Sequence, residues 1–315
     1  MLFRSTLAGF IAPYLLALAA FPFLAGRGPF LRIFPIGTCL LIIWSPWLIP
    51  AESPMLRFIA SISAAMLALK VIDVSLDLGL RRKVTWQAYI EFLTNPFTHV
   101  RRSLPHERRP SSRESLLRLL KGTITCVMAI AVLSGLYKVD WSGLPFMVEH
   151  VGKVTALMVA ITSALTAAAA MWRLGGGTAR DFMDRPFLSR TPAEFWRRYN
   201  RNVQQFFWQD VFNGNRGRRA PLRTMLLVFA LSALLHELVF FAAVGRVQGY
   251  QTAFFALQGI AAVSTARVKV QGTLAILSAA GTLAFNLSTS VLFFASVHAV
   301  VPFYSRELPL WLQGW

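Results

Sequence analysis

Long apolar stretches alternate with short polar ones along almost the whole chain. A stretch of about 20 apolar residues is long enough to cross the bilayer as a helix. Within the last of these stretches, Asn286, Ser288 and Thr289 are typical of either a break or a polar lining. The pattern predicts an all-α, polytopic integral membrane bundle of about eight transmembrane helices, near residues 6–25, 31–50, 56–76, 122–138, 152–172, 224–244, 250–267 and 273–303.

Two polar loops, residues 77–121 and 173–223, interrupt the series and carry ten and eleven Arg or Lys residues. Two predicted spans separate them, so both lie on one side of the membrane, and the positive-inside rule makes that side cytoplasmic. We therefore expect one multi-pass membrane domain over residues 1–315. The short loops favour a bacterial plasma membrane as its location.

The composition agrees with a membrane protein, because 55% of the residues are hydrophobic and 15% are charged, against roughly 25% charged in soluble domains. The net charge of +18 would ordinarily suggest nucleic acid. The charges are confined to a few loops, a pattern that fits cytoplasmic loops, anionic ligands and membrane lipids better. We expect no nucleic acid and no protein partner. Cys39 and Cys126 lie in apolar segments outside any CxxC pair, so no disulfide framework, zinc site or other metal site is expected.

The run LSALLHELVF, residues 231–240, places His236 near the middle of an apolar span. An ionisable side chain at that depth costs about 2.5 kcal/mol or more on insertion scales, so such residues tend to line paths or sites. A neutral imidazole there can act as a general base. Glu237 points about 100° away around the helix, and we expect it to form a buried ion pair with a loop arginine. Phe240 stands where HExxH needs its second His, which excludes a zincin site.

The other four histidines have simpler interpretations. We expect His99, His106 and His150 to be solvated loop residues, and His298 to have an interfacial or core role.

The second basic loop contains TPAEFWRRYNRNVQQFFWQDVF, beginning at Thr191. Thr191 can cap a helix, with Pro192 in the first turn and Glu194 closing a capping box. The sequence predicts one amphipathic helix that follows. Its simplest interpretation is a helix lying on the membrane surface. Before it, the glycine run LGGGT, residues 174–178, predicts a helix end and a hinge.

Three of these elements, in this order, resemble the membrane-bound O-acyltransferase (MBOAT) superfamily, and its wax synthase-like branch in particular. They are Arg185–Leu188 (RPFL), Phe195–Asn200 (FWRRYN) and Ala233–Glu237 (ALLHE). The close resemblance covers residues 180–265, and Leu56–Asp77 resembles an early helix of the family. Two positions depart from the pattern, because Tyr199 replaces the usual Trp and Ser232 stands where Gly is common. The HHxxxDG motif of soluble wax synthases is absent.

The resemblance implies an MBOAT-like helical bundle that transfers an acyl group from acyl-CoA to a hydroxyl acceptor. In the wax synthase-like branch the acceptor is a long-chain alcohol, so the resemblance to that branch implies wax ester synthesis, a reaction of lipid metabolism. It makes His236 the catalytic base and Asn200 its partner. Acyl-CoA would be a co-substrate, and no further cofactor is expected. The candidate substrate-binding residues are Trp196, Arg197, Arg198 and Tyr199, with the arginines able to meet CoA phosphates.

Two other classes remain open from the residues alone. One is a transporter in which His236 and Glu237 form a proton relay. The other is a membrane scaffold without an active site.

Overall fold

The structure, a computed structural model, describes residues 2–24, 29–79, 83–101, 110–207, 209 and 220–313. Every regular element in these ranges is a helix. The chain divides into two compact units. Unit 1 comprises Met1–Arg102, Gln205–Thr252 and Ala299–Val301, and unit 2 comprises Ser103–Gln204, Ala253–His298 and Pro302–Trp315.

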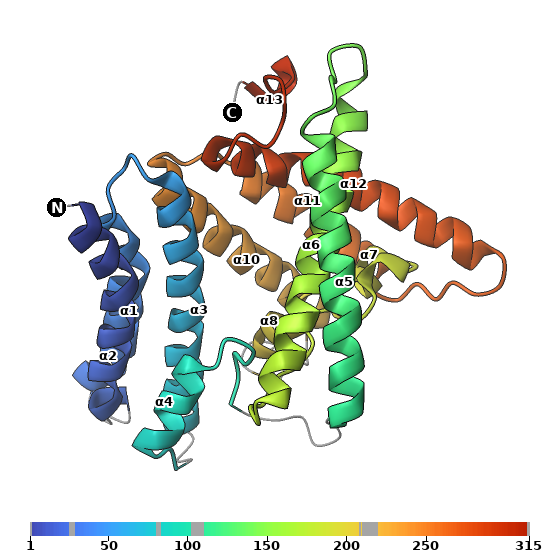
Figure 1. The fold of residues 1–315 in the computed structure, drawn as a ribbon. Helices are drawn as coiled ribbons and strands as arrows, with labels where there is room; N and C mark the ends of the chain where they lie inside the picture. The colour runs from blue at the N-terminus through green and yellow to red at the C-terminus, as the bar shows by residue number, and fades with distance from the viewer. Residues whose placement is uncertain are drawn as a thin grey trace. The chain divides into compact units, whose positions relative to one another are not determined.

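Unit 1 is built around helices α1 (Leu2–Leu24), α2 (Pro29–Trp44) and α3 (Pro54–Gly79), which lie side by side (Figure 1). A 3₁₀ turn, η1 (Ser45–Leu48), follows α2. The buried core of these helices contains several alanines, whose small side chains permit close helix packing, namely Ala17, Ala20, Ala64 and Ala68.

The short helix α4 (Trp86–Thr94) is fastened to this group by hydrogen bonds from two buried side chains, Tyr89 and Lys70. The Tyr89 hydroxyl donates to the carbonyl oxygen of Ala17 over 2.6 Å. From α3, the buried ammonium of Lys70 donates to the carbonyl oxygens of Phe92 and Leu93, at 2.8 and 3.1 Å. A cation at the C-terminal end of a helix satisfies carbonyls that have no partner within the helix. Lys70 is therefore a capping residue of α4.

Helix α10 (Pro221–Val244) also belongs to unit 1. Pro221 stands in its first turn, where the missing N–H costs nothing. The helix ends at Gly245, whose φ of 79° lies in the left-handed region that favours glycine. Ring contacts pack it onto its neighbours, because Phe240 lies 5.0 Å from Phe58 of α3 and Phe241 lies 5.2 Å from Trp47 of η1, measured between ring centroids.

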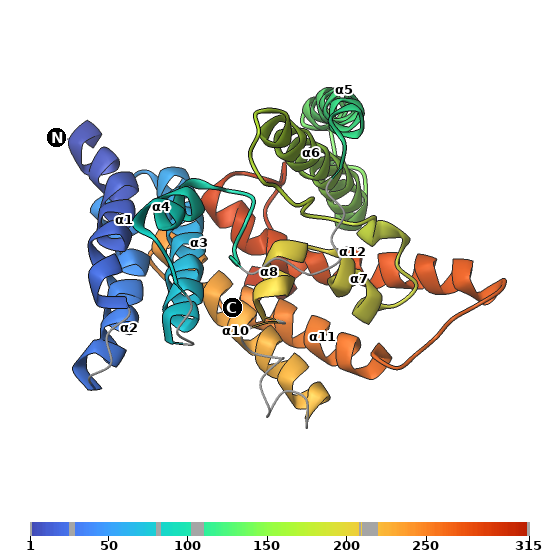
Figure 2. The ribbon, with the colours of Figure 1, turned by 90° about the horizontal axis from the view of Figure 1, so that it is seen from below.

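Unit 2 contains α5 (Ser112–Leu136) and α6 (Phe146–Leu174), which run side by side in both views (Figures 1 and 2). It also contains most of α11 (Tyr250–Thr265), α12 (Leu274–Val300) and the short α13 (Leu310–Gln313). A capping box starts α5. The Ser111 hydroxyl accepts from the Glu114 amide over 3.2 Å, and the Glu114 carboxylate accepts from the Ser111 amide over 2.8 Å.

The predicted spans all correspond to helices, and among the described residues six helices are long and apolar enough to cross a membrane: α1, α3, α5, α6, α10 and α12. The other two predicted spans form helices that are too short to count among these six. Residues 31–50 form α2 and η1, and residues 250–267 form α11. The possible break in the last span is wrong, because α12 is continuous from Leu274 to Val300. Asn286 and Thr289 accept hydrogen bonds from Gln258 of α11, so these polar residues connect α12 to α11.

Candidate active site

The segment that carries the RPFL and FWRRYN elements follows directly after the end of α6. Gly175 ends the helix, and Gly176 follows with a φ of 86°. At Gly177 a Cβ atom would lie 2.2 Å from Nε1 of Trp172, so any other residue here would require the exposed Trp172 ring to move. The predicted helix end at LGGGT is confirmed.

The single amphipathic helix predicted after Thr191 is wrong, because the chain forms two short helices, α7 (Pro192–Arg198) and α8 (Arg201–Phe206). The predicted cap is confirmed, since the Thr191 hydroxyl accepts from the Glu194 amide over 3.1 Å. The carboxylate of Glu194, however, accepts from the amide of Arg190 over 2.7 Å.

The break between α7 and α8 falls at Asn200, whose φ is 44°. Among the described residues only Asn200 and Arg185 are non-glycine residues with a positive φ. Asn tolerates this left-handed conformation better than most residues. Strained backbone of this kind clusters at functional sites, so the position of Asn200 is consistent with a role in one.

Asn200 is also the cap of α8. Its side-chain oxygen accepts from the amide of Val203 over 3.4 Å, and its carbonyl oxygen accepts from the amide of Gln204 over 3.0 Å. An Asn side chain has an accepting oxygen and a donating NH₂ group. Because the oxygen serves the helix, the NH₂ group is the part of Asn200 suited to donate to a ligand.

Trp196 and Tyr199 form an aromatic cluster with Phe195. The rings of Phe195 and Tyr199 are stacked with centroids 5.3 Å apart, and Trp196 meets Tyr199 edge-on at 5.5 Å. Burial raises the pKa of Tyr199. Nε1 of Trp196 donates to Oε1 of Gln258 over 2.9 Å. These two predicted substrate-binding residues thus have substantial contacts within the protein.

The two predicted phosphate-binding arginines differ in their surroundings. Arg198 forms an ion pair with Glu194 at 2.6 Å, with 33% of its side chain exposed, and donates to the carbonyl oxygen of Arg185 over 3.4 Å. Arg197 is exposed, and its guanidinium has no hydrogen bond or ion pair within the part of the chain that the structure describes. Arg197 is therefore the better placed of the two to bind an anionic ligand.

His236 is half-buried in α10, and the structure describes it within unit 1, whereas the FWRRYN residues belong to unit 2. Its Nδ1 lies 2.8 Å from the carbonyl oxygen of Ser232, one turn earlier. A carbonyl oxygen can only accept, so Nδ1 carries the proton and donates it. The other ring nitrogen, Nε2, then has the lone pair. This is the tautomer that a general base requires.

The carboxylate of Glu237, which is 8% exposed, accepts four hydrogen bonds near the start of α11. Its Oε1 accepts from the amides of Gln248 and Gly249 at 2.8 and 2.7 Å, and its Oε2 accepts from the amide and the hydroxyl of Thr252, both at 3.3 Å. The expected ion pair with a loop arginine is wrong for the described residues. The amides at a helix N-terminus stabilise an anion as a cation would, so no arginine is needed.

A family model for the membrane-bound O-acyltransferases, MBOAT, matches residues 95–294, well over half of the chain. The chain belongs to the MBOAT family. It is thus a membrane-bound O-acyltransferase, which favours the enzyme over the transporter and scaffold alternatives. No curated protein matches the chain at a significant level. The matched residues include all three elements on which the resemblance was based.

Sequence reasoning missed Gln258, which connects three helices of this O-acyltransferase. Besides accepting from Trp196 of α7, it donates through Nε2 to Thr289 over 2.8 Å and to Asn286 over 3.2 Å, both on α12. Its side chain is 1% exposed. The available signal was a Gln inside an apolar helix, paired with the polar residues of the last span, because buried amides need partners.

The expectation of solvated histidines is wrong for two residues of this O-acyltransferase, and His106 lies outside the described residues. His99 and His150 are buried. The hydroxyl of Tyr304 donates to Nδ1 of His150 over 2.7 Å, and Nε2 of His150 donates to the carbonyl oxygen of Leu287 over 2.9 Å. His298 has the structural role that was expected, because its Nδ1 accepts from the amides of Phe303 and Tyr304 at 3.0 and 3.1 Å.

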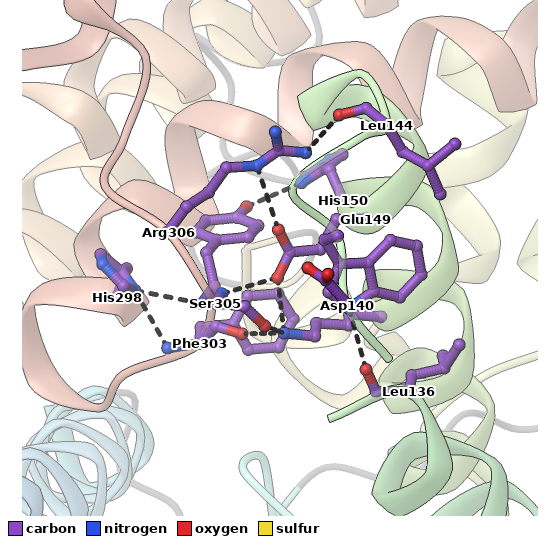
Figure 3. Close-up of polar contacts among 12 residues, drawn as sticks. Leu136, Asp140, Leu144, Glu149, His150, His298, Phe303, Ser305 and Arg306 are labelled. Carbon is purple, nitrogen blue, oxygen red and sulfur yellow. Dashed lines mark hydrogen bonds and ion pairs between the residues drawn. The ribbon is translucent and has the colours of Figure 1, made fainter. Parts of the chain in front are cut away.

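His150 belongs to a buried polar cluster in which α6 meets segment 303–306 (Figure 3). Lys153 and Glu149 are fully buried and form an ion pair at 2.6 Å. Lys153 also donates to the carbonyl oxygen of Phe303 over 3.1 Å, and the amide of Ser305 donates to Glu149 over 2.6 Å. Arg306 adds a longer ion pair to Glu149 at 3.5 Å. These bonds fasten segment 303–306 to α6.

Proposed function

We propose that this O-acyltransferase takes its acyl group from acyl-CoA and transfers it to the hydroxyl group of a lipophilic acceptor, with a long-chain alcohol as the first candidate. The product would then be a wax ester. The observation that carries the proposal is the hydrogen bond from His236 to Ser232, because it leaves Nε2 as a proton acceptor in an apolar helix.

In this proposal His236 is the general base. Nε2 takes the proton of the acceptor hydroxyl while its oxygen attacks the thioester carbonyl carbon. The resulting tetrahedral oxyanion is stabilised by a hydrogen bond from the NH₂ group of Asn200. When the carbon–sulfur bond breaks, the imidazolium returns its proton to the CoA sulfur. The products are one ester and one free thiol, and no covalent acyl-enzyme is required.

Acyl-CoA is proposed as the acyl donor because of the positive charge of the FWRRYN element and the apolar character of the spans. CoA carries several phosphates, and guanidinium groups bind phosphates through paired hydrogen bonds. The exposed Arg197 supports this use of the FWRRYN element. The apolar spans suit an aliphatic acyl chain, and hence a lipophilic acceptor.

The test is acyl transfer by the purified full-length protein in nanodiscs, with radiolabelled palmitoyl-CoA and a panel of acceptors: hexadecanol, a sterol, a terpenoid alcohol and a sugar. We expect labelled ester and free thiol in equal amounts, with hexadecanol the best acceptor. Thiol release without any ester would exclude the proposed transfer. Transfer to the sugar but not to hexadecanol would contradict the lipophilic acceptor while leaving acyl-CoA as the donor.

A further inference from the structure

We propose that Asp181 is a positioning residue of the acyl-transfer site, and that it holds the backbone of Asn200 in place through segment 182–184. The inference rests on the proposed role of Asn200. It concerns only unit 2, and it begins from the packing of α5 against α6.

Helices α5 and α6 approach each other closely at Gly122. A Cβ atom on Gly122 would lie 2.9 Å from the carbonyl oxygen of Ser163 and 3.0 Å from the amide nitrogen of Ala167, both in the backbone of α6. Such contacts allow only glycine at this position. Since the two backbones touch, the pair has little freedom to shift and can act as a rigid base for the residues at its ends.

Asp181 is bound to both helices of this base. Its Oδ1 lies 3.0 Å from Nη1 of Arg173, in the last turn of α6, and its Oδ2 is paired with Nη1 of Arg118 on α5. The side chain of Asp181 is 21% exposed, that of Arg173 is 8% exposed and that of Arg118 is 39% exposed. Ion pairs shielded from water are stronger than those on the surface, so the pair with Arg173 is the firmer of the two attachments.

Arg173 is itself held in place by further contacts. Its Nε donates to the hydroxyl of Ser115 on α5 over 3.3 Å, and its Nη1 donates to the carbonyl oxygen of Ala179 over 3.2 Å. The turn at the glycine run brings residues 179–181 back over the end of α6. The position of Asp181 is thus determined from two directions.

Segment 182–184 connects Asp181 to the break at Asn200. The amide of Arg201 donates to the carbonyl oxygen of Phe182 over 2.7 Å, and the amide of Asp184 donates to the carbonyl oxygen of Arg198 over 2.9 Å. These two bonds flank Asn200 on either side. Even for Asn the left-handed conformation is best retained where the surroundings constrain the backbone, and these bonds, anchored through Asp181, supply that constraint. Through these bonds, the position of Asp181 affects the direction in which the NH₂ group of Asn200 points.

The alternative is that the Asp181 pairs only stabilise the fold. A double-mutant cycle separates the two roles, because residues that act through one another have non-additive effects. The variants are Asp181→Asn, Asn200→Asp and their combination, each measured for kcat, for acyl-CoA KM and for the midpoint of thermal unfolding. Asp can still cap α8 and tolerate the left-handed conformation, but it cannot donate to an oxyanion.

We expect Asp181→Asn to lower kcat about tenfold, with the acyl-CoA KM unchanged, as for the loss of an interaction made only in the transition state. In the Asn200→Asp background the same change should have no further effect on kcat. Arg118→Gln, which leaves Arg173 paired with Asp181, should give a smaller loss and serves if Asp181→Asn does not fold. Arg306→Gln is the matched control, because it breaks another ion pair in unit 2, the one with Glu149, whose other partners are Lys153 and Ser305 rather than residues of segment 182–184.

Three results would overturn the inference. If Asp181→Asn or Arg118→Gln lowers the unfolding midpoint but leaves kcat intact, the pairs are structural. If the kcat effects of Asp181→Asn and Asn200→Asp multiply in the combined variant, Asp181 does not act through Asn200, while the proposed function stands. If Asn200→Asp itself keeps normal kcat, the oxyanion role of Asn200 in the proposed function fails, and this inference fails with it.

Discussion

The ring of His236 donates from Nδ1 to the carbonyl oxygen of Ser232 over 2.8 Å. The acceptor of this bond is the backbone of α10 itself, so the helix fixes the tautomer wherever His236 occupies this rotamer. Replacement of the ring is therefore a direct test of a base at Nε2.

We predict that His236→Gln lowers kcat by about 10²–10⁴-fold, the usual contribution of general-base catalysis. Gln keeps a similar size and can still hydrogen-bond, but it cannot take a proton near neutral pH. Single-turnover acyl transfer checks the change, and binding of a non-hydrolysable acyl-CoA analogue should remain. A His236→Gln protein with near-normal kcat would make His236 a packing residue.

The arginines of the FWRRYN element should separate by function. We predict that Arg197→Ala raises the acyl-CoA KM and makes it less sensitive to salt, because one exposed charge that meets phosphate is lost. Arg198→Ala should instead lower thermal stability with the donor KM intact, since Arg198 is paired with Glu194. Initial rates at several salt concentrations decide between them. If instead Arg198→Ala raises the acyl-CoA KM and Arg197→Ala does not, the ion pair between Arg198 and Glu194 opens when acyl-CoA binds.

Glu237 should matter more for stability than for chemistry. Glu237→Gln replaces one carboxylate oxygen by an NH₂ group that would face amide donors near the start of α11, and an unsatisfied buried group costs about 1–3 kcal/mol. We predict a clear fall in the unfolding midpoint with kcat reduced less than in His236→Gln. A stable but inactive Glu237→Gln protein would assign the catalytic role to the Glu.

The pair of Glu149 and Lys153 should behave as a unit. Lys153→Met leaves the buried Glu149 charge without its main partner, and the loss of one member of a buried pair costs about 3–5 kcal/mol. We predict that Lys153→Met with Glu149→Gln is more stable than Lys153→Met alone, as measured by thermal unfolding in detergent. A double variant destabilised by the sum of the two single effects would show that they are not coupled.

We predict that the buried His99 makes the stability of the fold sensitive to acid. Burial, with Lys70 nearby, lowers the pKa of His99 from 6.5 to about 3. As the pH falls below 6.5, His99 becomes protonated in the unfolded chain but stays neutral in the folded chain. The free energy of unfolding therefore decreases between pH 6.5 and about 3. Between pH 7 and pH 5 the loss should be about 2 kcal/mol. His99→Gln should flatten the pH dependence of the unfolding midpoint over this range, and an unchanged slope would assign it to other groups.

The helices of this protein could be predicted from the sequence because a lipid environment leaves few choices. Backbone groups in a bilayer must bond within their own segment, so each long apolar stretch forms a helix. The candidate chemical residues were found for a related reason, since His236 stands out against an apolar background. The family match to residues 95–294 supports the assignment made from the RPFL, FWRRYN and ALLHE elements.

What the sequence could not reveal depends on contacts between distant segments. His150 reads as a residue of a short polar loop, and its burial follows from Tyr304 and Leu287, more than 130 residues away. The division of the predicted amphipathic helix at Asn200 depends on the two backbone bonds from segment 182–184. Periodicity cannot detect either effect, because it reports only on neighbours along one element.

The fastening of α6 to segment 303–306 also has a consequence for biogenesis. Ser305 and Glu149 are 156 residues apart, and at 5–20 residues per second a ribosome needs roughly 10–30 s to add the missing segment. During that interval the buried charges of α6 have their internal ion pair, Glu149 with Lys153, and the ring of Tyr137 beneath the Lys153 ammonium. The contacts that complete this end of α6 therefore form only after almost the whole chain has been synthesised.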